Sequence, residues 1–136
     1  MLGRLFRVRI DARVHPQHVS LVVAGLYSRS EAFRVGEEAF REAAAAGRQN
    51  VLVDVRKVNG RVPPLLDRFD FGVHIANQHQ AFTPRVRLAV LGHEPMIHPE
   101  RFGELVARNR GADARVFTDE AEALQWLGAG ANPGGT

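Results

Sequence analysis

The segment from Val51 to Val55 constrains the fold most, because it is short, rich in β-branched residues and almost continuously apolar. Such a run is typical of a strand that is covered on both faces of a parallel sheet. Two further strand-like runs follow it, Val86 to Leu91 and Arg115 to Phe117. Helical patterns lie between these runs, and the alternation predicts an α/β fold with right-handed connections.

The residues before this run predict a hairpin at the edge of the sheet. Leu5 to Ile10 alternates between apolar and polar residues, and Val19 to Tyr27 is a second β-rich run. Pro16 lies between them and cannot donate to a central ladder, so we expect a turn or an edge there. The expected fold class is therefore α/β, a small mixed β-sheet opened by an N-terminal hairpin and flanked by about four helices.

Helix-end signals divide the rest of the chain. The residues expected to cap or open the four helices are Ser30, Pro64 or Leu65, Pro99 and Thr118. The residues expected to end the first, third and last helices are Gly47, Gly111 and Leu127. A loop is expected from Arg56 to Pro64. We expect one domain over residues 1–127 and a flexible, glycine-rich tail over residues 128–136.

Composition narrows the classes of function. The 136 residues include no cysteine, which excludes disulfides, thiolate zinc sites and a cysteine nucleophile. The formal charge is only +3 although the sequence pI is about 10.5, and acidic residues are interleaved with arginines, so we expect no nucleic-acid partner. No stretch approaches the ~18 apolar residues of a membrane span, and no signal-peptide core is present. We expect a cytoplasmic protein without a membrane span.

Polar residues follow two neighbouring strands of the expected sheet. Open α/β sheets bind ligands at the carboxyl ends of their strands. This rule predicts an anion-binding or protein-docking surface there, and the alternative is a solvated loop whose charges serve solubility. The candidate residues are Arg56, Lys57, Asn59, Arg61, His93 and Glu94.

No set of residues predicts catalysis. No serine lies in a Gly-x-Ser-x-Gly elbow, and no glycine-rich phosphate loop opens a helix. His93 and His98 flank a proline and could converge with Glu94, which leaves an enzyme as an alternative, although exposed loop histidines are the simpler interpretation. We expect no catalytic residue, no metal and no cofactor.

Three stretches resemble SpoIIAA-like proteins of the wider STAS group. They are the run from Val51 to Gly60, the segment from Phe102 to Gly111, and the closing run from Arg115 to Leu127. The resemblance implies a small sheet with helices against it and a non-enzymatic regulatory or protein-interaction module. It also implies a shape related to CRAL-TRIO lipid carriers, so a carrier or sensor of a small apolar or amphipathic ligand is the alternative.

One family feature has no counterpart here. In STAS anti-anti-sigma factors a phosphorylated serine lies in an Asp-Ser-Ser-Gly-type turn before the helix that follows the central strand. The matching stretch, Arg61-Val62-Pro63-Pro64-Leu65, has no hydroxyl group. The resemblance therefore implies a module without the usual phosphorylation switch at this position.

The second helix carries apolar residues on two sides. Leu66, Phe69 and Val73 share one side, and Phe71 and Ile75 share another. One side can pack on the sheet, while the other needs cover, because monomers rarely expose contiguous apolar patches. We therefore expect a homodimer with Phe71 and Ile75 at its interface. The alternative is that the neighbouring helix, or the loop around Phe82, covers Phe71.

Overall fold

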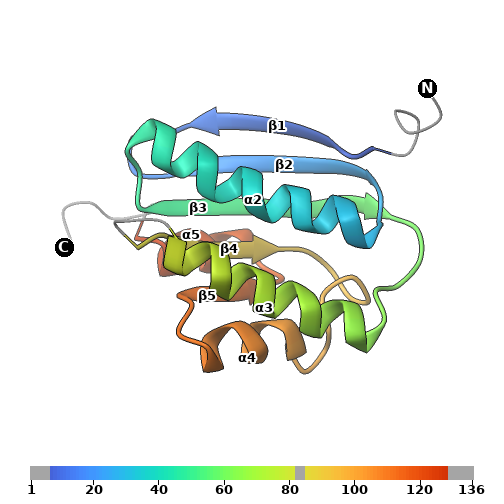
Figure 1. Cartoon of the computed structure of the whole chain (residues 1–136). Helices are drawn as coiled ribbons and strands as arrows, with labels where there is room; N and C mark the ends of the chain where they lie inside the picture. Colours follow the sequence, from blue (N-terminus) through green and yellow to red (C-terminus); the bar gives the residue numbers. More distant parts are fainter. Residues whose placement is uncertain (1–6, 82–84, 129–136) are drawn as a thin grey trace.

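The sheet has five strands and is mixed. The computed structural model describes residues 7–81 and 85–128, which form this sheet and four helices (Figure 1). The strands are β1 (Arg9–Val14), β2 (Val19–Leu26), β3 (Asn50–Asn59), β4 (Arg87–Leu91) and β5 (Ala114–Phe117), and they lie in this order across the sheet. β1 runs antiparallel to β2, and the other pairs are parallel. The predicted α/β fold with an opening hairpin is confirmed.

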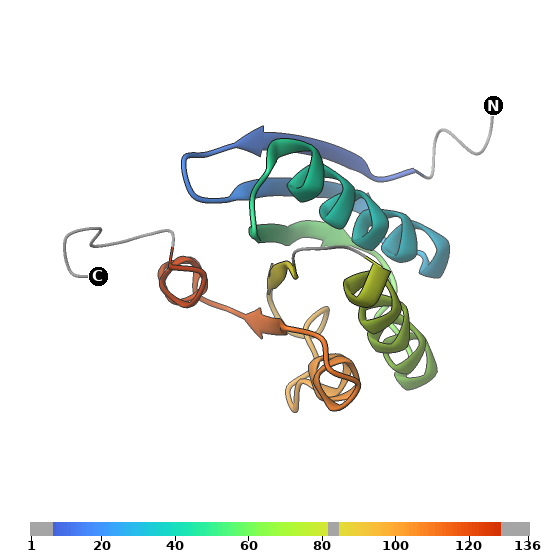
Figure 2. The ribbon, with the colours of Figure 1, turned by 60° about the vertical axis from the view of Figure 1, so that its left-hand side comes forward.

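The helices form two unequal layers. They are α2 (Arg29–Ala46), α3 (Leu65–Ala81), α4 (Phe102–Asn109) and α5 (Glu120–Trp126). Figure 2 shows α2, α3 and α4 on one side of the sheet and α5 on the other. None of the helices in the described residues is long and apolar enough to cross a membrane.

Two apolar clusters hold these layers to the sheet. The larger one joins alternate strand residues such as Leu21 and Val51 to Phe40 and Ile75 of the helices. The smaller one joins the intervening strand residues to α5, and its members are Leu52, Ala89, Leu91, Phe117, Ala123 and Leu127. Because both faces of β3 are covered, nearly every residue at its start is apolar. Val53 and Leu88 are 4% and 2% exposed, as predicted for the buried sheet.

Several predicted boundaries are wrong by a few residues. Ser28, not Ser30, caps α2, and its Oγ accepts a hydrogen bond from the Glu31 amide at 3.2 Å. Asp119, not Thr118, caps α5. α4 begins at Phe102, so Pro99 precedes the helix. Gly47 ends α2 in the left-handed conformation, with φ of 67°, as predicted.

The central strand is longer than the sequence suggested. β3 continues to Asn59, so Arg56 and Lys57 belong to the strand and not to a loop. Val22 pairs with Asp54, but Ala24 pairs with Lys57, which places one extra residue in β3. Of the predicted terminal segments, Leu5, Phe6 and residues 129–136 of the tail lie outside the described residues.

Two glycines bring α3 and α4 together. A Cβ atom added at Gly72 would lie 2.8 Å from the Gly103 carbonyl oxygen and 2.8 Å from Val106 Cβ. At Gly72, therefore, only a residue without a side chain fits. The close contact sets the position of α4 over β5.

Candidate functional site

A cavity of about 170 Å³ lies between the sheet and the layer formed by α2, α3 and α4. Valines form most of its floor, from β2, β3 and β4, and Val35 and Ile75 contribute from the helices. Its surface is predominantly apolar, and it is partly open to solvent. The polar lining residues come mainly from the first turns of the three helices and from the loops that precede them.

Tyr27 and Asp67 form a polar contact in the wall of the cavity. The Tyr27 hydroxyl donates to Asp67 Oδ2 at 2.8 Å, from the end of β2 to the first turn of α3. Burial, together with this hydrogen bond, raises the pKa of Tyr27 above its usual range. Arg61 contacts both residues. Its Nη2 lies 3.5 Å from Asp67 Oδ2, and its guanidinium carbon lies 5.9 Å from the centroid of the Tyr27 ring. The tyrosine is therefore a proton donor in this contact and stays neutral.

Arg68 joins two loops at this end of the molecule. Its guanidinium donates to the carbonyl oxygens of Pro63, Pro95 and Met96 at 3.1, 2.8 and 2.9 Å. Burial lowers the pKa of Arg68. The side chain thus fixes the loop after β4 against the start of α3, and it brings positive charge to the cavity wall.

Arg101 has a backbone conformation that is unusual for a residue with a side chain. It is the N-cap of α4, with φ of 56° and ψ of 42°, and its side chain makes no capping hydrogen bond. Left-handed conformations are disfavoured for residues with a side chain and natural for glycine. Arg101 lines the cavity, and within the described ranges its guanidinium has no hydrogen bond or ion pair.

The structure separates the predicted surface residues. Arg56 points to the α5 side of the sheet, where it lies 2.8 Å from Asp54 and 3.0 Å from Glu120. Lys57 and Asn59 are exposed at the end of β3, and the Asn59 carbonyl accepts from the Tyr27 amide at 2.7 Å. Of the predicted residues, all of which lie in the described part of the chain, only Arg61 contacts the Tyr27 and Asp67 side chains.

His93 and Glu94 are exposed in the loop after β4. His98, from the enzyme alternative, is half-buried at the cavity, and its Nδ1 accepts from the Glu100 amide at 3.0 Å. Among the residues that the structure describes, no three His, Asp or Glu side chains are grouped so that they could hold a metal ion.

Phe71 and Ile75 face the inside of the monomer. Ile75 is 2% exposed and packs against α2, where a Cβ atom added at Gly36 would lie 3.0 Å from Ile75 Cδ1. Phe71 is half-buried, with its ring centroid 6.5 Å from that of Phe33. The neighbouring helix α2 covers Ile75 and partly covers Phe71, so Ile75 is not available in the monomer for the expected interface, while a homodimer stays a prediction.

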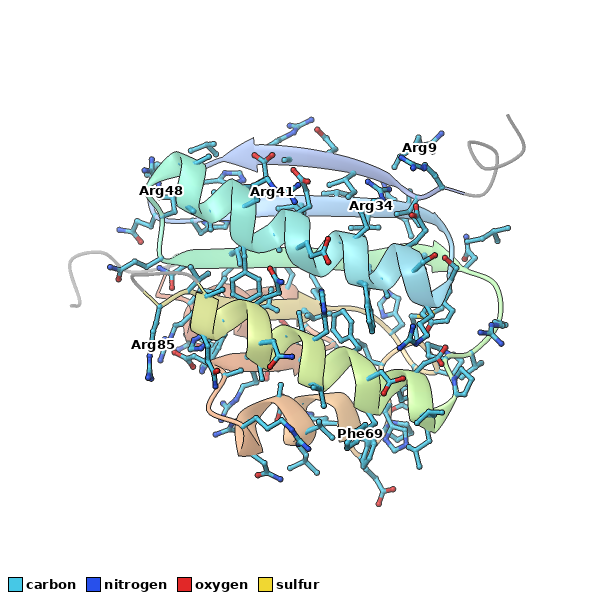
Figure 3. All side chains as sticks on the ribbon, viewed as in Figure 1. Arg9, Arg34, Arg41, Arg48, Phe69 and Arg85 are labelled. Atoms are coloured by element: carbon cyan, nitrogen blue, oxygen red, sulfur yellow. The ribbon has the colours of Figure 1, made fainter. Side chains whose placement is uncertain are left out.

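Four of the seven large apolar residues that are exposed in the described chain lie at or just before the start of α3. Leu65, Leu66 and Phe69 are spaced to share one side of this helix, and Val62 lies in the loop before it. Their exposed fractions are 56%, 68%, 36% and 49%. We call these four residues the α3 patch, and Figure 3 shows Phe69 on the outer side of the helical layer, where α3 lies beside α4.

Sequence reasoning missed Tyr27, Asp67, Arg68 and Arg101 as lining residues. They come from segments that are far apart in the chain, and none lies in a recognisable motif. The one available signal is the position of Tyr27 at the carboxyl end of a strand, where α/β sheets place their sites.

Comparisons with known proteins agree with this architecture. No protein-family profile and no curated protein matches the sequence. An anti-sigma factor antagonist from Mycobacterium paratuberculosis matches in structure with a TM-score of 0.58 and 12% identity, over 88% of this chain and 93% of that one. The anti-sigma factor antagonist SpoIIAA in its unphosphorylated form matches with a TM-score of 0.54 and 10% identity, over 92% of this chain and 99% of that one.

A third protein of known structure is also similar, an uncharacterized protein with a SpoIIAA-like fold from Shewanella loihica. It has a TM-score of 0.49 and 17% identity, over 89% of this chain and 93% of that one. The anti-sigma factor antagonists, with the strand order described above, establish a SpoIIAA-like, STAS-type fold for this chain.

Proposed function

We propose that this chain is a non-enzymatic regulatory module that acts by docking on another protein. The observation that carries the proposal is the α3 patch. Its four residues expose between 36% and 68% of their surface and lie within eight positions of the chain. Contiguous apolar patches on a monomer usually mark interaction sites. The two structural neighbours described as anti-sigma factor antagonists support a regulatory role.

Charged residues flank the patch. The guanidinium carbon of Arg110 lies 5.2 Å from the centroid of the Phe69 ring, and the side chain of Arg61 is 64% exposed beside Val62. Interfaces commonly have an apolar centre and a polar rim, in which arginine is enriched. We expect the partner to present apolar side chains to the patch and carboxylates to Arg61 and Arg110.

We expect no phosphorylation switch within the α3 patch. The stretch from Arg61 to Leu65 has no hydroxyl group, and Pro64 removes a backbone donor that a phosphate at the start of a helix would use. We expect docking to be regulated elsewhere or to be constitutive. Stoichiometric phosphate mapped between Arg56 and Asp67, on protein treated with host kinase extract, would contradict this expectation.

A second copy of the chain is another possible occupant of the patch. Two-fold dimers are the commonest assemblies, and Ile75 is buried in the monomer, so the α3 patch is a candidate surface for the expected homodimer. Sedimentation equilibrium over a wide concentration range separates the cases. A monomer that binds a different protein supports the docking proposal, and a dimer that Leu66→Glu dissociates replaces it with self-association.

The test of docking uses two matched substitutions. Leu66→Glu places a charge in the patch, and Leu26→Glu places the same charge at the end of β2, where the leucine is 49% exposed. Tagged wild type and both variants are purified from the host, and native mass spectrometry identifies the proteins that remain bound. We expect a stoichiometric partner with wild type and Leu26→Glu, but not with Leu66→Glu. Equal recovery from all three would contradict docking through the patch.

A further inference from the structure

We propose that the cavity under α2, α3 and α4 binds a small carboxylate whose apolar body has about six carbons. Protein interiors are close-packed, and voids of this size are few. A dry apolar cavity of about 150 Å³ can bind benzene, and the cavity here measures about 170 Å³. The proposal uses a surface different from the α3 patch and goes beyond the docking function.

The walls fit an apolar body. Val23, Val53 and Val90 line the sheet side, while Val35 and Ile75 line the helix side. These side chains offer no hydrogen bond, so a ligand that fills this space must be apolar there. The volume of about 170 Å³ matches an apolar body of about six carbons better than a long-chain lipid.

The charges that surround the cavity favour an anionic end group. Each of the three lining carboxylates already has an arginine partner: Glu31 with Arg34 at 2.9 Å, Asp67 with Arg61 at 3.5 Å, and Glu104 with Arg108 at 3.7 Å. In contrast, the three lining arginines, Arg68, Arg101 and Arg115, pair with no carboxylate in residues 7–81 and 85–128, and the Arg115 guanidinium lies over the Trp126 ring. The unbalanced charge is therefore positive and attracts an anion.

Arg101 is the residue expected to contact the carboxylate. Its left-handed backbone would suit glycine, yet an exposed arginine occupies the position, and its guanidinium has no protein partner in the described residues, so it is free to reach an anion. Strained positions of this kind cluster at binding sites. The first turn of α4 follows directly, has no side-chain cap, and contributes Gly103 and Glu104 to the cavity lining. His98 also lines the cavity, and because its Nδ1 accepts from the Glu100 amide, its Nε2 is the nitrogen that could donate to a ligand.

The first test titrates the purified protein with hexanoate, hexanol and hexylamine by isothermal titration calorimetry. We expect hexanoate to bind most tightly and hexylamine most weakly. Arg101→Gln should weaken hexanoate binding about tenfold, as the loss of a charge-assisted hydrogen bond implies, and should leave hexanol binding unchanged. Arg85→Gln removes the same charge from an exposed arginine outside the cavity and should change neither.

The second test fills the cavity. Ala32→Leu adds three carbons to a lining residue of α2, and Ala45→Leu makes the same change on the exposed side of that helix. We expect Ala32→Leu to abolish binding of both hexanoate and hexanol while circular dichroism shows a folded protein, and Ala45→Leu to retain it. Binding that survives Ala32→Leu, tighter binding of hexylamine than hexanoate, or no binding of any probe at millimolar concentration would overturn the proposal. Leu66→Glu should leave hexanoate binding intact. The ligand proposal and the docking proposal can therefore be refuted independently of each other.

Discussion

Replacing Gly72 by Ala should destabilise the protein, whereas Gly103→Ala, across the same helix crossing, should stabilise it. At Gly72 the new Cβ would lie 2.8 Å from a backbone oxygen and 2.8 Å from Val106 Cβ. Neither atom is the end of a flexible side chain, so α3 and α4 must move apart. At Gly103 the nearest atom to a new Cβ is the Arg68 carbonyl oxygen at 3.5 Å, which is an ordinary contact.

The expected magnitudes follow from two opposing effects. Removing a glycine from a helix gains about 0.5–1 kcal/mol, because the unfolded chain loses conformational freedom. Overpacking costs about 1–3 kcal/mol. We therefore expect Gly72→Ala to lower the free energy of unfolding by about 1 kcal/mol or more, and Gly103→Ala to raise it by up to about 1 kcal/mol.

Urea unfolding followed by circular dichroism measures both changes on the same scale. If Gly72→Ala unfolds at the same or a higher urea concentration than wild type, the close α3–α4 crossing is wrong. If Gly103→Ala is the more destabilised of the two, the position without room for a side chain is Gly103 and not Gly72.

Three further predictions test the core, the strained residue and the buried histidine. Val53→Asp should lower the free energy of unfolding by more than about 3 kcal/mol, because it buries an unpaired charge, and an unchanged urea midpoint would refute the strand assignment. Arg101→Gly should raise the free energy of unfolding by about 1 kcal/mol, and a loss would show that the left-handed conformation is absent. Burial lowers the pKa of His79 from its usual 6.5, so the unfolded state takes up a proton first as pH falls, and the free energy of unfolding should decrease below about pH 6.5. His79→Gln should reduce this decrease, while His93→Gln, at an exposed position, should not.

The sequence predicted the sheet because its signals are local. The run from Val51 to Val55 is apolar at nearly every position, since Val51 and Val53 face the α2–α4 layer and Leu52 faces α5. Gly47 was recognised as a helix end for a similar reason, because its left-handed backbone is a property of one residue. Features of this kind need no knowledge of distant neighbours.

The missed features depend on tertiary contacts. Arg56 to Asn59 looked like a loop because three of the four residues are polar, but pairing of Lys57 to Asn59 with the end of β2 keeps the segment in the strand. Ile75 looked like an apolar residue without cover because the sequence of α3 does not reveal where α2 lies. In the structure Ile75 packs against α2, where Gly36 leaves space for its side chain. The cavity likewise appears only when the helices are placed over the sheet.

Site-specific photo-crosslinking tests the docking proposal most directly. The photoreactive amino acid p-benzoylphenylalanine replaces Leu66 in the α3 patch or, as a control, Leu26 at the end of β2, and living host cells are irradiated. We expect one discrete adduct, heavier than this chain by the mass of a partner protein, from position 66 and not from position 26. No adduct at position 66, or the same adducts from both positions, would contradict a docking function for the α3 patch.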